Sequence, residues 1–89
     1  MDKDLIFIDV MTFTNKAHIY IYKNGTEQSQ SCPLDKLAET VNMLCATYKI
    51  NDVKMSGSKQ FLTNYVKDIQ ELNKQTYSNF DLMIEVIPV

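Results

Sequence analysis

Four consecutive residues, Ser56-Gly57-Ser58-Lys59, have the types and spacing that could hold an anion. They separate an expected strand from an expected helix, and the free backbone amides at a helix start attract negative charge. The segment has a single Gly and lacks the GxxxxGK[ST] spacing of a phosphate loop. An ordinary capped turn is the alternative interpretation, and the missing spacing favours it.

The remaining reactive side chains lack sequence partners. His18 has no Cys or His at metal-ligand spacing, so we interpret it as a surface residue of a strand. Cys45 lies on the apolar stripe of an expected helix and should be a buried small hydrophobe, whereas Cys32 is close to a helix start, where the pKa of a thiol could be lowered. Neither thiol has a base nearby in the sequence. We therefore assign no catalytic residue and expect no cofactor.

The first third of the chain has the patterns of β-strands. Residues 5–13 are apolar at odd and even positions, which indicates a strand covered on both faces. Residues 17–23 alternate between aliphatic and aromatic or His side chains, which also predicts a strand. Asn24-Gly25 favours a type I′ turn, so the polar residues 26–31 should return as an edge strand.

The rest of the chain predicts two helices and two more strands. Apolar residues recur every three or four positions in residues 33–49 and again in residues 58–75, and this spacing is typical of amphipathic helices. Residues 53–56 and 80–89 alternate as strands do. A chain of 89 residues can enclose one core, so residues 1–89 are expected to form a single domain.

This order of elements, β-β-β-α-β-α-β, predicts an α/β fold. Two tight turns make the first three strands antiparallel, and each helix should be a right-handed crossover between parallel strands. The result is a five-stranded mixed sheet with the strand order 3-2-1-4-5. Successive crossovers that run in the same direction place both helices on one face of the sheet.

The topology resembles the ribonuclease H-like fold, which is shared in outline with actin-like domains. Phe7-Ile8-Asp9-Val10 is similar to the first-strand segment that carries a metal-binding Asp in that family, and Glu39 lies where a second carboxylate could come from. The family's nuclease chemistry uses several carboxylates around two metal ions. Here the fourth strand ends in Ser56-Gly57, and no later helix supplies the last acid. We therefore expect the fold without the catalysis or a bound metal, and a reduced nuclease is a further alternative.

One face of the expected sheet has no helix to cover it. A solvated sheet face is usually polar, whereas this one is rich in aromatic and Met side chains, as the centre of a protein interface is. Asp9, Lys54 and Glu85 lie among them. We expect a non-enzymatic interaction module that forms a homodimer through this face, or that binds another protein with it. The expected interface residues are Phe7, Met11, Phe13, His18, Tyr20, Tyr22, Met83 and Ile87.

Composition restricts the other partners. All nine basic residues are Lys and the net charge is −2. The protein as a whole therefore does not attract a phosphate backbone, and nucleic acid is not the expected partner on this ground. Binding of single-stranded nucleic acid by stacking on the aromatic face is the alternative.

The apolar run that starts at Leu5 is too short for a signal peptide or a membrane span, so we expect a cytoplasmic protein with no membrane contact and with Cys32 and Cys45 reduced. The Lys-, Asn- and Ile-rich usage without Arg resembles that of bacterial phage and mobile-element proteins.

Overall fold

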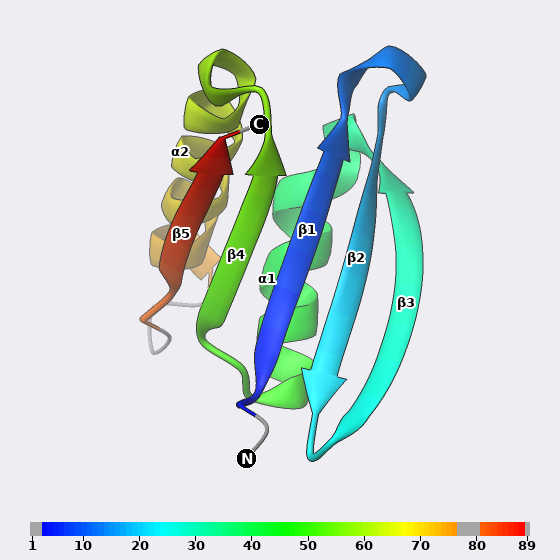
Figure 1. Ribbon diagram of the computed structural model, residues 1–89. Helices are drawn as coiled ribbons and strands as arrows, with labels where there is room; N and C mark the ends of the chain where they lie inside the picture. Colours follow the sequence, from blue (N-terminus) through cyan, green and yellow to red (C-terminus); the bar gives the residue numbers. More distant parts are fainter. Residues whose placement is uncertain (1–2, 77–80, 89) are drawn as a thin grey trace.

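A five-stranded mixed sheet forms one layer of the protein and two helices form the other (Figure 1). The structure is a computed structural model that describes residues 3–76 and 81–88. The strand order is β3-β2-β1-β4-β5, with β1 antiparallel to β2, β2 antiparallel to β3, and β1, β4 and β5 mutually parallel. This confirms the predicted order and topology. The strands are β1 (Leu5–Met11), β2 (Lys16–Lys23), β3 (Thr26–Pro33), β4 (Asp52–Gly57) and β5 (Met83–Pro88).

Both helices lie on the same side of the sheet, behind it in Figure 1. Helix α1 (Leu37–Tyr48) follows a short 3-10 turn, Leu34–Lys36, and connects β3 to β4. Helix α2 (Lys59–Thr76) connects β4 to β5. The predicted arrangement of the helices is confirmed, because the crossovers β3 to β4 and β4 to β5 move in one direction along the sheet.

Some predicted boundaries were wrong. Strand β1 ends at Met11, so Phe13 lies in the 3-10 turn Thr12–Thr14, which Asn15 closes in the left-handed conformation (φ 58°). Pro33 ends β3 with an extended ψ of 150°, and the α-helix begins only at Leu37. A φ near −65° suits both a helix and a strand, so Pro alone does not distinguish them.

The final strand also differs from its predicted bounds. It was expected over residues 80–89, whereas β5 begins at Met83. Positions 80 and 89, at the two ends of that expectation, lie outside the described residues.

The core lies between the sheet and the helices. The side chains of β1 and β2 that face the helices, Ile6, Ile8, Val10, Ile19 and Ile21, are all buried, at 7% exposure or less. Each large aliphatic side chain removed from water contributes about 1.5–3 kcal/mol. This burial fixes which side of each strand faces the helices and which remains uncovered.

A polar contact joins the two helices inside this core. The Asn42 side-chain amide donates to the carbonyl oxygens of Ala38 (2.9 Å) and Ile69 (3.1 Å), and Asn73 donates to the Asn42 side-chain oxygen (3.2 Å). Asn42 is buried, so each of these bonds satisfies a group that water cannot reach. The contact fixes the position of α2 relative to α1.

Candidate functional site

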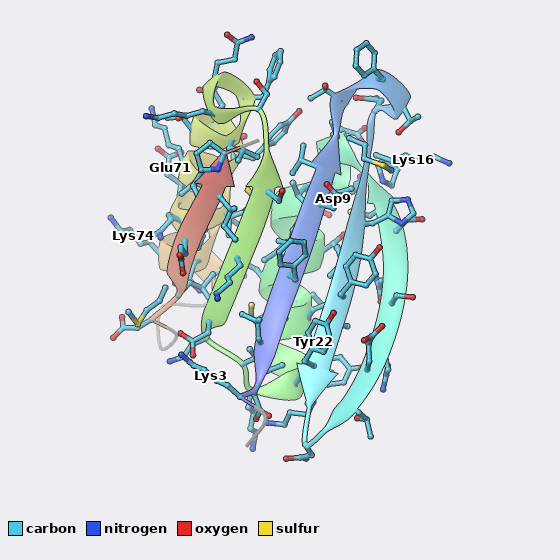
Figure 2. The ribbon with its side chains drawn as sticks, in the orientation of Figure 1. Lys3, Asp9, Lys16, Tyr22, Glu71 and Lys74 are labelled. Carbon is cyan, nitrogen blue, oxygen red and sulfur yellow. The ribbon has the colours of Figure 1, made fainter. Side chains whose placement is uncertain are left out.

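The uncovered side of the sheet is the candidate site, and we call it the open face. Figure 2 looks onto it, with Asp9 and Tyr22 in front of the ribbon. Side chains alternate along each strand, so the open face consists of the residues between the buried ones. It comprises Leu5, Phe7, Asp9 and Met11 of β1, Lys16, His18, Tyr20 and Tyr22 of β2, Glu27, Ser29, Ser31 and Pro33 of β3, Asp52, Lys54 and Ser56 of β4, and Met83, Glu85 and Ile87 of β5.

Strand register arranges these side chains in rows across the sheet. The first row runs Glu27, Tyr22, Leu5 on β3, β2 and β1, and Asp52 pairs with Met83 at the same end of β4 and β5. The second row runs Ser29, Tyr20, Phe7, Lys54, Glu85. The third runs Ser31, His18, Asp9, Ser56, Ile87. The aromatic and large apolar side chains of these rows therefore lie on β1, β2 and β5, while β3 is polar on this face except for Pro33 at its end.

An aromatic pair lies in the middle of the open face. The rings of Phe7 and Tyr20 have centroids 6.3 Å apart at an interplanar angle of 54°. This tilted arrangement is one that aromatic rings favour. Next to it, the pKa of the Tyr22 hydroxyl is raised above 10.0, first because neighbouring groups displace water and then because the Glu27 carboxylate repels a phenolate. Tyr22 thus stays an uncharged hydrogen-bonding group at neutral pH.

A shallow hollow of about 430 Å³ opens between these side chains. Its lining is mainly apolar and aromatic, and Lys54 contributes the one ammonium group. The lining residues are Leu5, Phe7, Tyr20, Tyr22, Lys54 and Ile87. Lys54 was predicted on this face, whereas Leu5 was absent from the predicted interface residues. Leu5 lies two residues before Phe7 on β1, and this spacing was a signal that could have identified it.

Two apolar side chains of β5 project into solvent on this face. Met83 is 67% exposed and Ile87 is 37% exposed. Phe13, which is fully exposed, lies on the turn after β1 and is not on the open face, so its predicted position there was wrong. The turn displaced it because β1 stops two residues earlier than the apolar pattern indicated.

Asp9 and Glu39 are not brought together. Asp9 lies on the open face, while Glu39 is exposed on α1, on the opposite side of the sheet. Within residues 3–76 and 81–88, no group of three or more His, Cys, Asp or Glu side chains is placed to hold a metal ion. The neighbours of Asp9 in the sheet are His18 and Ser56.

The segment Ser56-Gly57-Ser58-Lys59 forms the junction between β4 and α2. The Ser58 carbonyl oxygen accepts hydrogen bonds from the amides of Phe61 and Leu62, both at 3.0 Å, which begins the helix. Gly57 has a φ of 154°, and a Cβ there would lie 3.1 Å from Leu62 Cδ2 and 3.2 Å from the Val10 carbonyl oxygen. Close packing therefore accounts for the Gly without any ligand.

Both thiols are free and buried. Burial raises the pKa of the Cys45 thiol to about 12, as expected for a small hydrophobe in the core. The suggestion that the Cys32 pKa could be lowered was wrong. Cys32 lies on β3 instead of at a helix start, and burial raises the pKa of its thiol. His18 is half-buried on β2, on the open face.

Comparison with known proteins finds no matching family model, no similar curated protein and no similar solved structure. In the described part of the chain, no helix is both long and apolar enough to cross a membrane.

Proposed function

We propose that this protein is a non-enzymatic interaction module that forms a homodimer through the open face. The supporting observation is the uncovered group of large apolar side chains on a sheet whose other face is packed against helices. Phe7, Tyr20 and Tyr22 are joined there by Met83 and Ile87. A second copy of the chain is the occupant that supplies a surface of matching size and composition.

The dimensions of the molecule fit a dimer of ordinary size. Its two larger extents are 32 and 28 Å, which outline a face of roughly 900 Å². A stable protein interface buries about 800 Å² on each partner. One face of the molecule is therefore comparable in size to the surface that a specific dimer buries.

Stability also favours covering this face. Each large apolar side chain withdrawn from water contributes about 1.5–3 kcal/mol, and a domain this small has a margin of only a few kcal/mol. A symmetric dimer uses one surface twice, so it covers the patch without leaving a contact that could propagate into fibres.

We further propose that the likeness to the ribonuclease H-like fold is one of topology without nuclease chemistry. The strand order and the two helices support the likeness. The separation of Asp9 from Glu39 by the sheet supports the loss of catalysis, because two-metal cleavage needs carboxylates that converge on shared ions.

Sedimentation equilibrium at micromolar concentrations tests the dimer. We expect the wild-type chain to sediment as a dimer and Tyr22→Asp to raise the dissociation constant by at least about 100-fold, because it desolvates two charges inside the contact. Met43→Asp is the matched control. It adds the same charge at an exposed apolar residue of α1, away from the open face, and should leave the dimer intact.

A stable wild-type monomer at these concentrations would overturn the proposal. Fluorescence anisotropy with a labelled oligothymidylate would then show whether the aromatic face binds single-stranded nucleic acid, which stacking on Phe7 and Tyr20 would permit.

A further inference from the structure

We propose that the free edge of β3 pairs antiparallel with the β3 edge of a second copy of this chain, which joins two sheets into one. β3 is the last strand of the sheet, and in the described part of the chain no strand pairs with its outer side (Figure 1). The inference goes beyond the proposed open-face dimer because it uses a different surface. The edge lies in the plane of the sheet, so it stays accessible when the open face is covered.

Pro33 determines which backbone groups of β3 point to this edge. Residues opposite one another on antiparallel strands alternate between pairs that exchange backbone hydrogen bonds and pairs that do not. Pro33 has no N–H, so its pair with Lys16 cannot exchange them. One residue later, the Leu34 amide donates to the Asn15 carbonyl oxygen (3.1 Å), as the alternation requires. Every second residue before Pro33 therefore turns its N–H and C=O away from β2. These residues are Glu27, Ser29 and Ser31.

β3 lacks the features that usually protect a sheet edge. Natural edges are blunted by short strands, bulges, Pro or charged side chains, especially Lys. β3 is eight residues long, and its pairing with β2 is continuous. Residues 26–32 contain one charged side chain, Glu27, and no Pro or Lys. Residues 26–31 are all exposed, so their outward N–H and C=O groups can reach another strand.

The opposite edge of the sheet, formed by β5, is less suitable. The Met83 amide donates to the carbonyl oxygen of Asn51, just before β4 (2.8 Å). Alternation along the strand then determines which residues of β5 turn their backbone groups to the free edge. They are Ile84, Val86 and Pro88. Because Pro88 has no N–H, β5 offers two complete positions for pairing, whereas β3 offers three.

A second copy matches the β3 edge when a two-fold axis passes through Ser29. Ser29 then lies opposite the partner's Ser29, and Glu27 lies opposite the partner's Ser31. Each of these residues donates one backbone hydrogen bond across the seam and accepts one. The single charge of the strand meets a hydroxyl group, so no like charges oppose one another.

Neighbouring registers match less well. An axis through Gln28 places Ser31 opposite the partner's Gly25, which belongs to the turn and lies outside the strand. An axis through Gln30 places the Glu27 backbone against the partner's Pro33, which has no N–H to donate. The axis through Ser29 is therefore the register that satisfies every outward N–H and C=O between Glu27 and Ser31.

The polar composition of the edge makes this contact weak by itself. Ser, Gln and Thr side chains bury little apolar surface, and each new hydrogen bond replaces one to water. We therefore expect a dissociation constant of roughly 1 mM, far above the micromolar range in which the open-face dimer is tested. At such concentrations the contact links open-face dimers into larger assemblies.

Charges on the helix side of β3 test the register without altering the open face. Gln28 and Gln30 are exposed there, and Gln28 faces the partner's Gln30 across the seam. In Gln28→Lys/Gln30→Glu, each Lys meets a Glu of the partner, so the dissociation constant of the edge contact should fall by at least about 3-fold. An axis through either residue would instead set like charges together at that residue, and the contact would weaken.

Gln28→Lys/Gln30→Lys is the matched control. Both double variants lose the hydrogen bond that the Tyr48 hydroxyl donates to Gln28 (2.9 Å), so they differ only at position 30. The control sets Lys against Lys and should raise the dissociation constant by at least about 10-fold. Sedimentation velocity between about 0.1 and 2 mM measures both variants beside the wild type.

Ser29→Pro tests the backbone hydrogen bonds directly. The Ser29 N–H points away from β2, so Pro at this position is compatible with the β2–β3 pairing but removes the bond at the axis. It should raise the dissociation constant by at least about 10-fold, whereas Ser29→Ala, which keeps the N–H, should assemble as the wild type does. Circular dichroism of both variants at micromolar concentration checks that the fold is retained.

The outcomes separate this inference from the proposed function. The edge contact would be overturned if the wild type formed nothing larger than the open-face dimer at 2 mM. It would also be overturned if Ser29→Pro assembled normally, or if Gln28→Lys/Gln30→Glu assembled no more tightly than the wild type. In each case an open-face dimer seen at micromolar concentration would stand. A wild-type monomer at micromolar concentration that pairs near 1 mM, and is disrupted by Ser29→Pro, would support the edge contact and overturn the open-face dimer.

Discussion

At the scale of single residues, a side chain enclosed between the sheet and the helices differs from one on the open face. Cys45 on α1 is 1% exposed, and burial raises the pKa of its thiol from 9.0 to about 12. Tyr22 on the open face has a raised pKa as well, but its surroundings include the Glu27 carboxylate. The first residue is inert because it is enclosed, whereas the second is a hydrogen-bonding group held at a surface.

The Cys45 thiol predicts a specific loss of stability in alkali. In the unfolded chain this thiol ionises near pH 9, while in the folded chain it stays protonated up to about pH 12. Above pH 9 the unfolded state therefore binds fewer protons, and the free energy of unfolding falls as the pH rises. Urea titrations under reducing conditions between pH 8 and 10.5 should show a contribution approaching about 1.4 kcal/mol per pH unit that Cys45→Ala lacks. Equal pH slopes for the two proteins would contradict this assignment.

At the scale of elements, the junction of β4 and α2 depends on one backbone conformation. Gly57 is buried at a φ of 154°, and its Cα faces Val10 of β1 and Leu62 of α2. A side chain there would be strained in its backbone and would press on both neighbours. The junction sets where α2 starts, so its geometry affects how the helix packs on the sheet.

We therefore expect Gly57→Ala to lower the free energy of unfolding by roughly 1–3 kcal/mol in urea denaturation. Ser58→Ala at the exposed neighbouring position is the control and should stay within about 1 kcal/mol of wild type. If Gly57→Ala were as stable as wild type, close packing would not explain the glycine at this position. An anion site in Ser56-Gly57-Ser58-Lys59 would then be the remaining interpretation.

At the scale of the whole molecule, the layer arrangement is asymmetric. Two helices cover one face of the sheet, and no element in the described part of the chain covers the other (Figure 1). The thickness of 19 Å agrees with two layers of about 10 Å each. A second sheet placed on the open face would complete a symmetric four-layer assembly of helices, sheet, sheet and helices.

The proposed dimer predicts that folding depends on protein concentration. If only native chains form it, mass action makes the melting temperature rise with protein concentration. Calorimetry or circular dichroism between about 2 and 200 μM should show this rise for the wild type and for Met43→Asp. Tyr22→Asp should melt at a lower temperature that does not change over the same range. A wild-type melting temperature independent of concentration would argue against a dimer linked to folding.

The sequence by itself determined the elements, their order and the sheet topology. Asn24 and Gly25 adopt the positive φ angles that a type I′ turn requires, so this turn could be predicted from two residues. The alternation of Ile19 and Ile21 with Tyr20 and Tyr22 likewise identified the two faces of β2. Such signals are local, because turn chemistry and periodicity act over a few neighbouring residues.

Only the tertiary structure decided the limits of the open face and the rows of side chains across it. The exclusion of Phe13 depended on where β1 stops, and the rows depended on the register between strands far apart in the sequence. The separation of Asp9 from Glu39 depended on which side of the sheet the helices occupy. The environment of Cys32 depended on the length of β3. Each of these features follows from contacts between segments that are distant in the sequence. Many such contacts act together, so they leave no local pattern in the chain.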